Sequence, residues 1–477
     1  MKYDYHIIVI GAGSAGLVVA SGAAGLKAKV ALIEKDKMGG DCLNYGCIPS
    51  KTLLKSGHVA NVIQNAANFG INTNNPTIDI AKITQRIKNV ISDIAPHDSK
   101  KRYEGLGVTV YTGLAKFVNK HEIAINGEII SAANIVIATG SYPVVPKIPG
   151  LDQVNYYTNE TIFDIKVLPQ KLIVLGAGPI GCELGQAFAN LNSEVTLVDM
   201  APTLFSKDEP EVSAIMQQQF KKDRIKLALA SKIIAIDQKD QTIAVTIEKA
   251  GQQSVIYGDT LLLALGRKAN IEQLDLAKVN VKVSKNGQII TNNKLQTSEK
   301  NIYACGDVTS PYAFTHMAGY HASIVVQNII FPIKKQVDYT KVPWVTYTLP
   351  EVAHIGYTEQ QLIQQNIRYK KYFEPLKNND RSKTAGDENG FLKILTNHKG
   401  VMIGATMVSN HAGEEIMAAS IAINKKMKLA EFASIIVPYP TESEIYKTLG
   451  FKVVKEGFTP WKQKLVQKLF LSQRNIK

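Results

Sequence analysis

The sequence predicts an α/β fold with two Rossmann-like nucleotide-binding domains and a C-terminal domain of the α+β type. Three observations predict it. A glycine fingerprint follows an apolar strand near the start of the chain, the same pattern returns at Gly176, and alternating strands with helices come after residue 341. The length of 477 residues fits about three domains. Hydrophobic residues make up 45% and charged residues 20%, which is ordinary for a globular protein.

The first fingerprint stands near the start of the chain. Ile7–Ile10 is an apolar strand that runs into Gly11-Ala-Gly13-Ser-Ala-Gly16, and a small-residue helix is predicted to follow. The next strand, Val30–Ile33, ends at Glu34. Such glycines permit a tight turn and a close approach of the backbone to a pyrophosphate at a helix N-terminus. The acid at the end of the second strand binds a ribose hydroxyl.

The stretch Gly39–Lys51 places Cys42 and Cys47 with four residues between them. A helix that begins here would lower the pKa of a thiolate through its positive N-terminal end. We interpret the pair as a redox-active disulfide; the alternative is two structural cysteines or half of a metal site. Because only Cys182 and Cys305 remain elsewhere, each alone in an apolar run, a four-cysteine zinc site has no second pair, and we expect no bound metal.

The second fingerprint repeats the first with the same spacing. Leu172–Leu175 leads into Gly176-Ala-Gly178-Pro-Ile180-Gly181, and the strand Val195–Val198 ends at Asp199. The acid follows the first glycine by 23 residues in both units. Two such units predict two dinucleotides, FAD and a nicotinamide nucleotide, because FAD relays electrons between nicotinamide and a disulfide.

The acid of the second unit predicts which nicotinamide nucleotide is used. Asp199 would accept a hydrogen bond from a free 2′-hydroxyl and would repel a 2′-phosphate. No arginine follows it closely; Met200, Ala201 and Pro202 come next. We therefore expect NAD(H) in preference to NADP(H).

The remaining elements follow in chain order. Asn61–Asp98 contains helical stretches with polar interruptions, and Asn126-Gly127 is typical of a hairpin turn between strands. Further strands are predicted at Val108–Phe117, Glu122–Ile130, Ile135–Ala138, Leu261–Leu265, Asn301–Val308, Phe391–Thr396 and Val401–Met407. Further helices are predicted at Thr315–Ile329, Gly413–Asn424 and Leu429–Ile435.

Taken together, these motifs make the chain resemble the class I flavoprotein (pyridine nucleotide-) disulfide oxidoreductases, from about Tyr5 to Tyr446. Ala138-Thr139-Gly140, Leu265-Gly266-Arg267 and Cys305-Gly306-Asp307 complete the pattern. The stretches Phe314–Ala318 and Pro343–Thr348 are similar to the mercuric-reductase-like branch, with dihydrolipoamide dehydrogenase as the other candidate. The resemblance implies an FAD-binding domain at 1–150 and 268–340, an NAD(P)-binding domain at 151–267, a homodimerisation domain at 341–457, and a basic extension at 458–477.

The resemblance also implies roles for single residues. Glu34 would bind the adenosine ribose of FAD and Asp307 the ribityl chain, and backbone groups of Ala115 and Thr315 would contact FAD. Cys47 would lie against the flavin as charge-transfer thiol, and Cys42 would exchange with substrate. Lys51 would lie near the flavin and Glu183 would approach from the nicotinamide side; the alternative for Lys51 is an exposed helix lysine. The other expected cofactor-binding residues are Gly11, Gly13, Gly16, Thr139, Gly140, Gly176, Gly178, Ile180, Gly181, Asp199 and Gly266.

One position departs from the dithiol-using members. They carry a histidine before Pro-Thr, supplied by the other subunit and oriented by a glutamate; here Tyr439 and Glu444 occupy these places. Imidazole titrates near pH 6.5 and shuttles protons, whereas a phenol titrates near pH 10. This favours a soft metal ion such as Hg(II) as acceptor over a lipoamide-type dithiol. No cysteine follows Cys305 to deliver a metal ion, so a quinone or another protein's disulfide stays open as the electron acceptor. The alternative interpretation of Tyr439 is an aromatic residue packed in the dimer interface without a chemical role.

The charge pattern concerns partners and compartment. The net charge is +14. Four cysteines in so long a chain indicate a reducing cytoplasm. We expect neither a signal peptide nor a membrane span. After Phe451 the basic residues are Lys452, Lys455, Lys462, Lys464, Lys468, Arg474 and Lys477. We expect a solvated tail whose apolar residues within Trp461–Phe470 pack on the dimer, and no nucleic acid. The alternative is weak contact with an anionic membrane surface, in a redox or binding module with little turnover.

Overall fold

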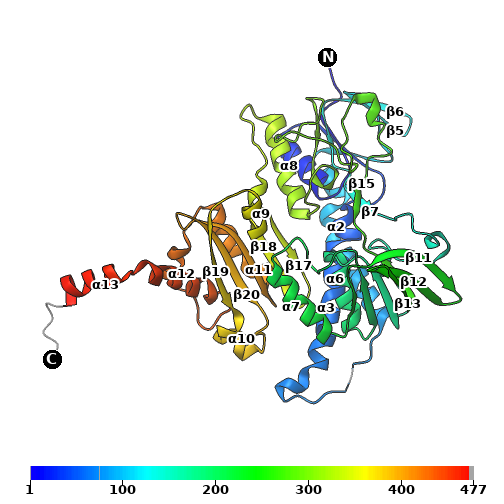
Figure 1. Ribbon diagram of the computed structural model, residues 1–477. Helices are drawn as coiled ribbons and strands as arrows, with labels where there is room; N and C mark the ends of the chain where they lie inside the picture. Colours follow the sequence, from blue (N-terminus) through cyan, green and yellow to red (C-terminus); the bar gives the residue numbers. More distant parts are fainter. Residues whose placement is uncertain (1, 75, 472–477) are drawn as a thin grey trace. The chain divides into compact units, whose positions relative to one another are not determined.

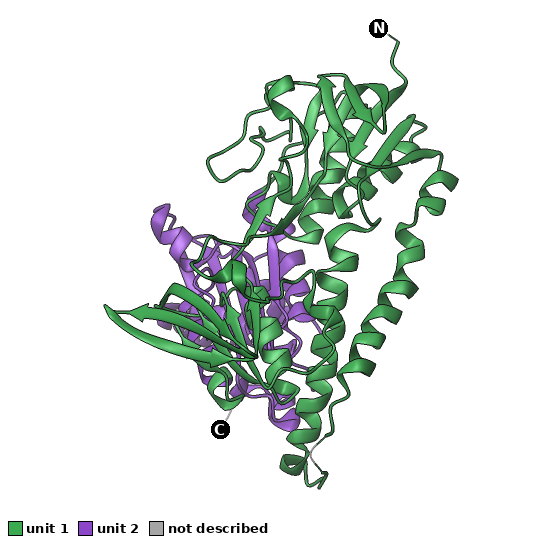
Figure 2. Cartoon of the chain, turned by 90° about the vertical axis from the view of Figure 1, so that its right-hand side faces the viewer, with its two compact units in different colours: residues 1–204, 220–338 green, residues 205–219, 339–477 purple. Residues whose placement is uncertain are grey.

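The computed structural model describes residues 2–74 and 76–471 (Figure 1). The chain divides into two compact units, shown in Figure 2: unit 1 is Met1–Leu204 with Phe220–Asp338, and unit 2 is Phe205–Gln219 with Tyr339–Lys477. Unit 1 contains both nucleotide-binding sheets, so the domain boundaries within it stay predictions. Among the described residues, no helix is long and apolar enough to cross a lipid bilayer.

The first sheet of unit 1 has seven strands in the order β3-β2-β1-β6-β5-β4, with β16 paired to β6. The strands are β1 (Tyr5–Ile10), β2 (Val30–Glu34), β3 (Val108–Thr112), β4 (Lys116–Asn119), β5 (Glu122–Ile125), β6 (Glu128–Ile137) and β16 (Ile302–Ala304). Between β5 and β6, Asn126 and Gly127 have φ of 51° and 84°, which fits the predicted hairpin turn.

The predicted strand over Asn301–Val308 is correct only for β16. Gly306 takes a φ of 77°, and a 3₁₀ helix η6 (Gly306–Val308) replaces the end of the predicted strand. Pairing with β6 nevertheless brings this late segment of the chain into the first sheet.

Alternate residues of β1 enter two separate cores. Ile7 and Val9 pack with the helices α1 (Ser14–Gly25) and α8 (Thr315–Ile330). Ile8 and Ile10 pack on the opposite face with residues of β5. Because both faces of this parallel strand are covered, the sequence of β1 is almost continuously apolar.

The second nucleotide-binding sheet is parallel and has the order β10-β9-β8-β14. Its strands are β8 (Lys171–Leu175), β9 (Glu194–Val198), β10 (Lys226–Ala228) and β14 (Thr260–Leu263), and helix α6 (Pro179–Asn190) follows β8. The rest of this region is an antiparallel sheet of β11 (Lys232–Lys239), β12 (Thr242–Lys249) and β13 (Gln252–Gly258), and a ladder of β7 (Ser141–Pro143) with β15 (Arg267–Ala269). The predicted repeat of strand, helix and strand is therefore confirmed.

The chain between β2 and β3 of the first sheet, which contains the two cysteines, forms a series of α-helices. They are α2 (Gly40–Asn44), α3 (Cys47–Gln64), α4 (Ile80–Ile94) and α5 (Lys100–Gly105). The short 3₁₀ helices of unit 1 are η1 (Ala66–Phe69), η2 (Ala95–Asp98), η3 (Leu151–Gln153), η4 (Ile162–Asp164) and η5 (Leu276–Val279). The α3 helix contacts both α4 and α6, so two neighbouring helices hold it in place.

Unit 2 is built on an antiparallel sheet of order β17-β18-β21-β20-β19. The strands are β17 (Pro343–Thr346), β18 (Glu351–Gly356), β19 (Tyr369–Pro375), β20 (Phe391–Asn397) and β21 (Met402–Ser409). The α-helices are α7 (Pro210–Lys222), which begins in unit 2, α9 (Glu359–Gln364), α10 (Asp380–Ala385), α11 (Ala412–Asn424), α12 (Glu444–Gly457) and α13 (Pro460–Val466). The 3₁₀ helices are η7 (Tyr339–Lys341), η8 (Leu376–Asn378) and η9 (Leu429–Ser434). The last described helix, η10 (Gln467–Leu471), is a π-helix. Residues of α11 and α12 share one core with the sheet, which confirms the α+β character of this region.

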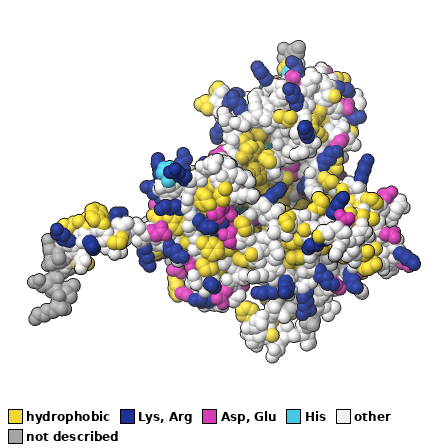
Figure 3. All heavy atoms as spheres, viewed as in Figure 1, with side chains coloured by type: hydrophobic (Ala, Val, Ile, Leu, Met, Phe, Trp, Pro, Cys, Tyr) yellow, Lys and Arg dark blue, Asp and Glu magenta, His cyan; other side chains and the backbone are white. Residues whose placement is uncertain are grey.

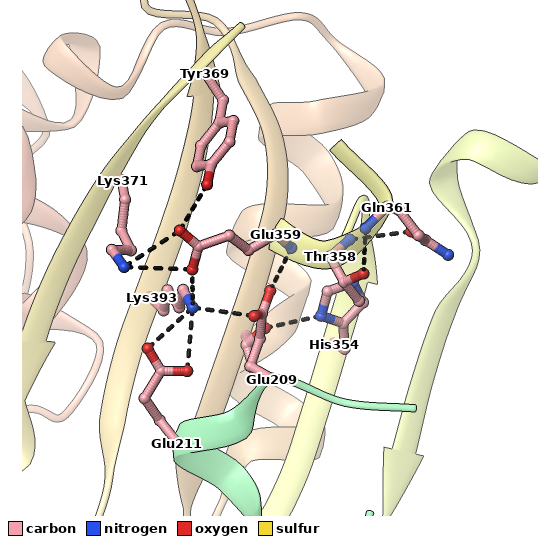
Figure 4. Close-up of polar contacts among 10 residues, drawn as sticks. Glu209, Glu211, His354, Thr358, Glu359, Gln361, Tyr369, Lys371 and Lys393 are labelled. Atoms are coloured by element: carbon pink, nitrogen blue, oxygen red, sulfur yellow. Dashed lines mark hydrogen bonds and ion pairs between the residues drawn. The ribbon is translucent and has the colours of Figure 1, made fainter. Parts of the chain in front are cut away.

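A buried lysine joins the two sequence segments of unit 2 (Figure 4). The Lys393 side chain on β20 is 1% exposed, and its Nζ lies 3.0 Å from carboxylate oxygens of both Glu209 and Glu211. The Nζ also lies 2.7 Å from Glu359. Burial alone would lower the pKa of Lys393, but these carboxylates raise it, so the lysine stays charged. The ion pairs fix the segment that precedes α7 to the sheet.

Candidate active site

The acid of each fingerprint is held by the backbone in the same way. One Glu34 oxygen accepts from the Ala12 N–H at 2.6 Å, and the other accepts from the Asp36 N–H at 2.9 Å. The two Asp199 oxygens accept from the Ala177 and Ala201 N–H groups, at 2.6 and 2.7 Å. In both units the carboxylate is fixed beside the glycine turn, where it can receive a ribose hydroxyl.

The first glycine of each fingerprint is required by close packing. Gly11 and Gly176 have φ of 102° and 106°. A Cβ at these positions would lie 2.4 Å from the carbonyl oxygen of Ala138 and 2.3 Å from that of Ala264. The next glycines, Gly13 and Gly178, precede α1 and α6 without a side-chain cap, which leaves the helix N-termini for a pyrophosphate.

The two cysteines stand on successive helices, and both are thiols in this structure. Cys42 lies within α2, and Cys47 is the first residue of α3, so this stretch contains two helices where the sequence suggested one helix start. A hydrogen bond from Cys42 lowers the pKa of Cys47 to about 6, against burial, with help from Thr315 and Lys51. The same hydrogen bond, with burial, raises the pKa of Cys42. These opposite shifts favour Cys47 over Cys42 as the thiolate of the pair.

Two further predicted residues lie around Cys47. Thr315, at the start of α8, places its Oγ1 3.4 Å from the Cys47 Sγ. Lys51, one turn along α3, places its Nζ 2.8 Å from Glu183 Oε2 on α6. Glu183 is buried and Lys51 is half-buried, so Lys51 is not an exposed helix lysine. The structure thus brings together Cys42, Cys47, Thr315, Lys51 and Glu183.

An arginine connects three motifs in a way that the sequence did not predict. Arg267 pairs with Asp41, the residue before Cys42, at 3.0 Å. The Arg267 Nε donates to Ser141 Oγ at 2.8 Å, and Ser141 donates to Asp307 Oδ2 at 2.7 Å. The sequence contains one sign of these contacts: Arg267 directly follows Gly266, and Ser141 directly follows Gly140. In the structure both glycines take positive φ. The contacts fix the redox segment to the Asp307 turn.

Polar groups around this network fit a flavin nucleotide. The Thr139 Oγ1 is buried without a hydrogen-bond partner among the described residues. Burial raises the pKa of Asp307, although Ser141 donates to it, and a ribityl hydroxyl would supply a further donor. Ala115, the residue before β4, is also buried. Buried polar atoms of this kind require partners, and a flavin nucleotide would provide them.

Tyr439 belongs to unit 2 and is 70% exposed. Its hydroxyl donates to Asp380 Oδ2 on α10 at 3.2 Å, and this hydrogen bond raises the pKa of the phenol. Glu444, the predicted orienting acid, is the first residue of α12. Asp380 was not predicted from the sequence, because it lies 59 residues from Tyr439 and has no motif around it.

Two nucleotide fingerprints, a cysteine pair beside the first of them and an antiparallel terminal domain define a flavin-dependent disulfide oxidoreductase. Comparison with known families agrees. The family model "Pyridine nucleotide-disulphide oxidoreductase" matches residues 5–322, and its dimerisation domain matches residues 342–449. The chain belongs to the pyridine nucleotide-disulphide oxidoreductase family.

Individual relatives include two enzyme types. The mercuric reductase of Staphylococcus aureus is 35% identical over 454 residues, covering 95% of this chain and 83% of that protein. The mitochondrial dihydrolipoyl dehydrogenase 1 of Arabidopsis thaliana is 32% identical over 460 residues, covering 93% and 89%. Among solved structures, the HOCl-induced flavoprotein disulfide reductase RclA from Escherichia coli has a TM-score of 0.84 at 26% identity, covering 94% of this chain and 100% of that one.

Membership of the family confirms the general predictions. The protein is an oxidoreductase that uses FAD, a pyridine nucleotide and a redox-active disulfide, and its C-terminal domain forms a homodimer. The relatives differ in substrate, so the electron acceptor does not follow from the family.

Proposed function

We propose that this enzyme oxidises NADH and passes two electrons, through FAD and the Cys42–Cys47 pair, to a thiophilic metal ion such as Hg(II). The net reaction converts NADH to NAD⁺ and one proton and reduces Hg(II) to Hg(0), which balances the two electrons. The observation that carries the proposal is Tyr439 at the position where dithiol-using relatives have a histidine.

Tyr439 cannot replace imidazole as a proton acceptor at neutral pH. Its hydroxyl already donates to Asp380, and the pKa of the phenol is raised above its ordinary value. Loss of a general base typically costs about 10²–10⁴ in rate. A metal ion held by thiolates needs no proton shuttle between sulfur atoms, so the missing base is no handicap for this substrate.

The cysteine pair suits such a substrate. Metal binding requires deprotonated thiols, and the Cys47 pKa of about 6 supplies one thiolate at neutral pH. Mercuric reductases are among the most similar relatives, and one matching structure is a Cu(II) complex of RclA. We propose that Cys42 meets the acceptor and that Cys47 lies against the flavin.

The other site residues receive roles on the same basis. We propose that Glu34 binds the adenosine ribose of FAD, that Asp307 binds the ribityl chain, and that Lys51 and Glu183 lie beside the flavin. Asp199 favours NADH, because its carboxylate accepts a 2′-hydroxyl and repels a 2′-phosphate. Tyr439 and Glu444 would reach the cysteines of the partner subunit, so the active site is shared across the dimer. The proposed compartment is the cytoplasm.

Dihydrolipoamide is the second candidate substrate. The observation in its favour is the 32% identity to dihydrolipoyl dehydrogenases over 93% of the chain. Glu444 is also present where these enzymes orient their histidine. A quinone or a protein disulfide remains a further alternative acceptor.

An acceptor panel tests the proposal. The purified holoenzyme is first mixed anaerobically with NADH, which we expect to bleach the flavin. Hg(II), Cu(II), lipoamide, glutathione disulfide, an aromatic disulfide and a quinone are then each supplied with NADH or NADPH. We expect metal-ion reduction with NADH to exceed lipoamide turnover by at least about tenfold.

Cys42→Ser is the matched control, because it should abolish metal reduction while NADH still bleaches the flavin. Brisk lipoamide turnover by the unaltered enzyme would contradict the proposed acceptor. A preference for NADPH would contradict the role of Asp199.

A further inference from the structure

The segment Phe458–Leu471, here called the tail segment, is exposed along its whole length. It comprises α13 and η10, which continue beyond the end of α12, and none of their residues is buried. Figure 1 shows α13 extending away from the sheet of unit 2. The tail segment also lies beyond residue 449, where the match to the dimerisation domain ends.

The tail segment carries a continuous apolar stripe. Trp461, Leu465 and Leu469 recur at intervals of four residues, with Val466 and Phe470 beside them. Trp461 is 68% and Phe470 is 64% exposed. Figure 3 shows hydrophobic and basic side chains next to one another on this projecting segment. Contiguous exposed apolar surface of this kind marks a site of interaction.

The charge of the tail segment favours an anionic partner. It contains Lys462, Lys464 and Lys468 and no aspartate or glutamate. These lysines belong to a chain whose net charge is +14. An anionic surface would attract them.

The apolar side chains favour lipid over nucleic acid as the anionic partner. Leu465, Val466 and Leu469 cannot stack on bases, but they can enter the region between headgroups and acyl chains. Trp461 suits that boundary, because its ring is apolar while its N–H remains in contact with water. A lysine-bearing helix with leucine and aromatic residues is typical of binding in the plane of a membrane.

We propose that the tail segment attaches this enzyme to the surface of an anionic lipid bilayer. The apolar stripe enters the headgroup boundary, and Lys462, Lys464 and Lys468 contact lipid phosphates. Attachment is reversible, because the electrostatic attraction falls off over about one Debye length from the membrane surface and is screened by added salt. The proposal is independent of the electron acceptor.

Vesicle co-sedimentation of the full-length holoenzyme tests the proposal. Vesicles contain phosphatidylcholine either alone or with about 30% phosphatidylglycerol. We expect binding only to the anionic vesicles, with a marked loss in high salt. A full-length variant with Trp461→Ser, Leu465→Ser and Phe470→Ser should bind at least about tenfold more weakly, because the altered side chains supply the buried apolar area.

A charge variant with a matched control completes the test. Lys462→Glu, Lys464→Glu and Lys468→Glu together should also lower binding by at least about tenfold. Lys239→Glu, Lys249→Glu and Lys285→Glu make the same change in net charge at exposed positions elsewhere and should bind as the unaltered protein does. Flavin reduction by NADH should be equal in all of them.

Three results would overturn the proposal. One is failure of the unaltered protein to bind anionic vesicles at low salt. Another is conversion of the dimer to monomer by the tail-segment serine variant in size-exclusion chromatography, because the stripe would then pack on a second copy. The third is equal loss of vesicle binding in the control lysine variant, since general charge would then explain attachment.

Discussion

At the scale of single residues, the proposed function depends on one thiol with an unusual environment. Cys47 receives a hydrogen bond from Cys42, lies 3.4 Å from Thr315 Oγ1, and begins an 18-residue helix. Lys51 lies one turn further along that helix and adds a positive charge. Each of these stabilises a thiolate, because helix N-termini, donors and cations all favour the charged form.

The pH dependence of Cys47 alkylation follows from this environment. In the reduced enzyme, the rate with iodoacetamide should be constant above pH 7 and should fall to half near pH 6, since the thiolate reacts and the thiol does not. Cys42→Ala removes the largest stabilising contact and should move the midpoint upward by about one unit or more. Cys42→Ser keeps a donor and serves as the matched control. A midpoint near pH 9 in the unaltered enzyme would contradict the assignment of Cys47 as thiolate.

Which site residues were predictable depends on how far apart in sequence their partners lie. Glu34 and Asp199 bond to backbone N–H groups of their own fingerprint units, so a local spacing predicts them. The Arg267–Asp41 pair joins residues more than 200 positions apart, and its geometry exists only after the chain has folded. Local pattern therefore identifies the reacting groups but not the residues that hold them in place.

At the scale of elements, β20 buries a charged residue. Lys393 interrupts an otherwise apolar run, and a lysine is almost never fully buried unless it is paired, yet both Lys393 and its neighbours are buried. The carboxylates of Glu209, Glu211 and Glu359 make this possible. Burial tends to raise the pKa of Glu359, but hydrogen bonds from Lys393, Tyr369 and Lys371 lower it to about 2.

Removing the Lys393 charge should destabilise unit 2. Lys393→Met leaves the Glu209 carboxylate buried without its cation, which typically costs about 3–5 kcal/mol. Lys371→Met is the matched control on β19, because Lys371 is 46% exposed and its pair with Glu359 should contribute only about 0–1 kcal/mol. Unfolding in urea, followed by the fluorescence of Trp344 on β17, measures both. Equal midpoints for the two variants would show that the buried cluster does not stabilise unit 2.

At the scale of the whole molecule, the order of segments along the chain differs from their order in the sheets. The first sheet includes β16, which lies 165 residues after its neighbour β6, and unit 2 includes residues 205–219. A periodicity of two or 3.6 residues predicts each strand or helix separately. It cannot predict such pairings, and here the resemblance to a family supplied the discontinuous FAD domain, whose boundaries stay a prediction.

The choice of electron acceptor also depends on the whole molecule, because in the proposed arrangement Tyr439 lies beside the cysteines of the partner subunit. Tyr439→His restores an imidazole with a pKa near 6.5, and Asp380 lies within reach to favour its charged form. If the missing base limits dithiol chemistry, the oxidation of dihydrolipoamide by NAD⁺ should become at least about tenfold faster. Tyr439→Phe is the matched control and should leave dihydrolipoamide oxidation slow, since it keeps the ring and supplies no base. Steady-state kcat with dihydrolipoamide, together with Hg(II) reduction for each variant, separates the two substrates. An unchanged kcat in Tyr439→His, or efficient dithiol turnover in Tyr439→Phe, would mean that residue 439 does not determine the acceptor.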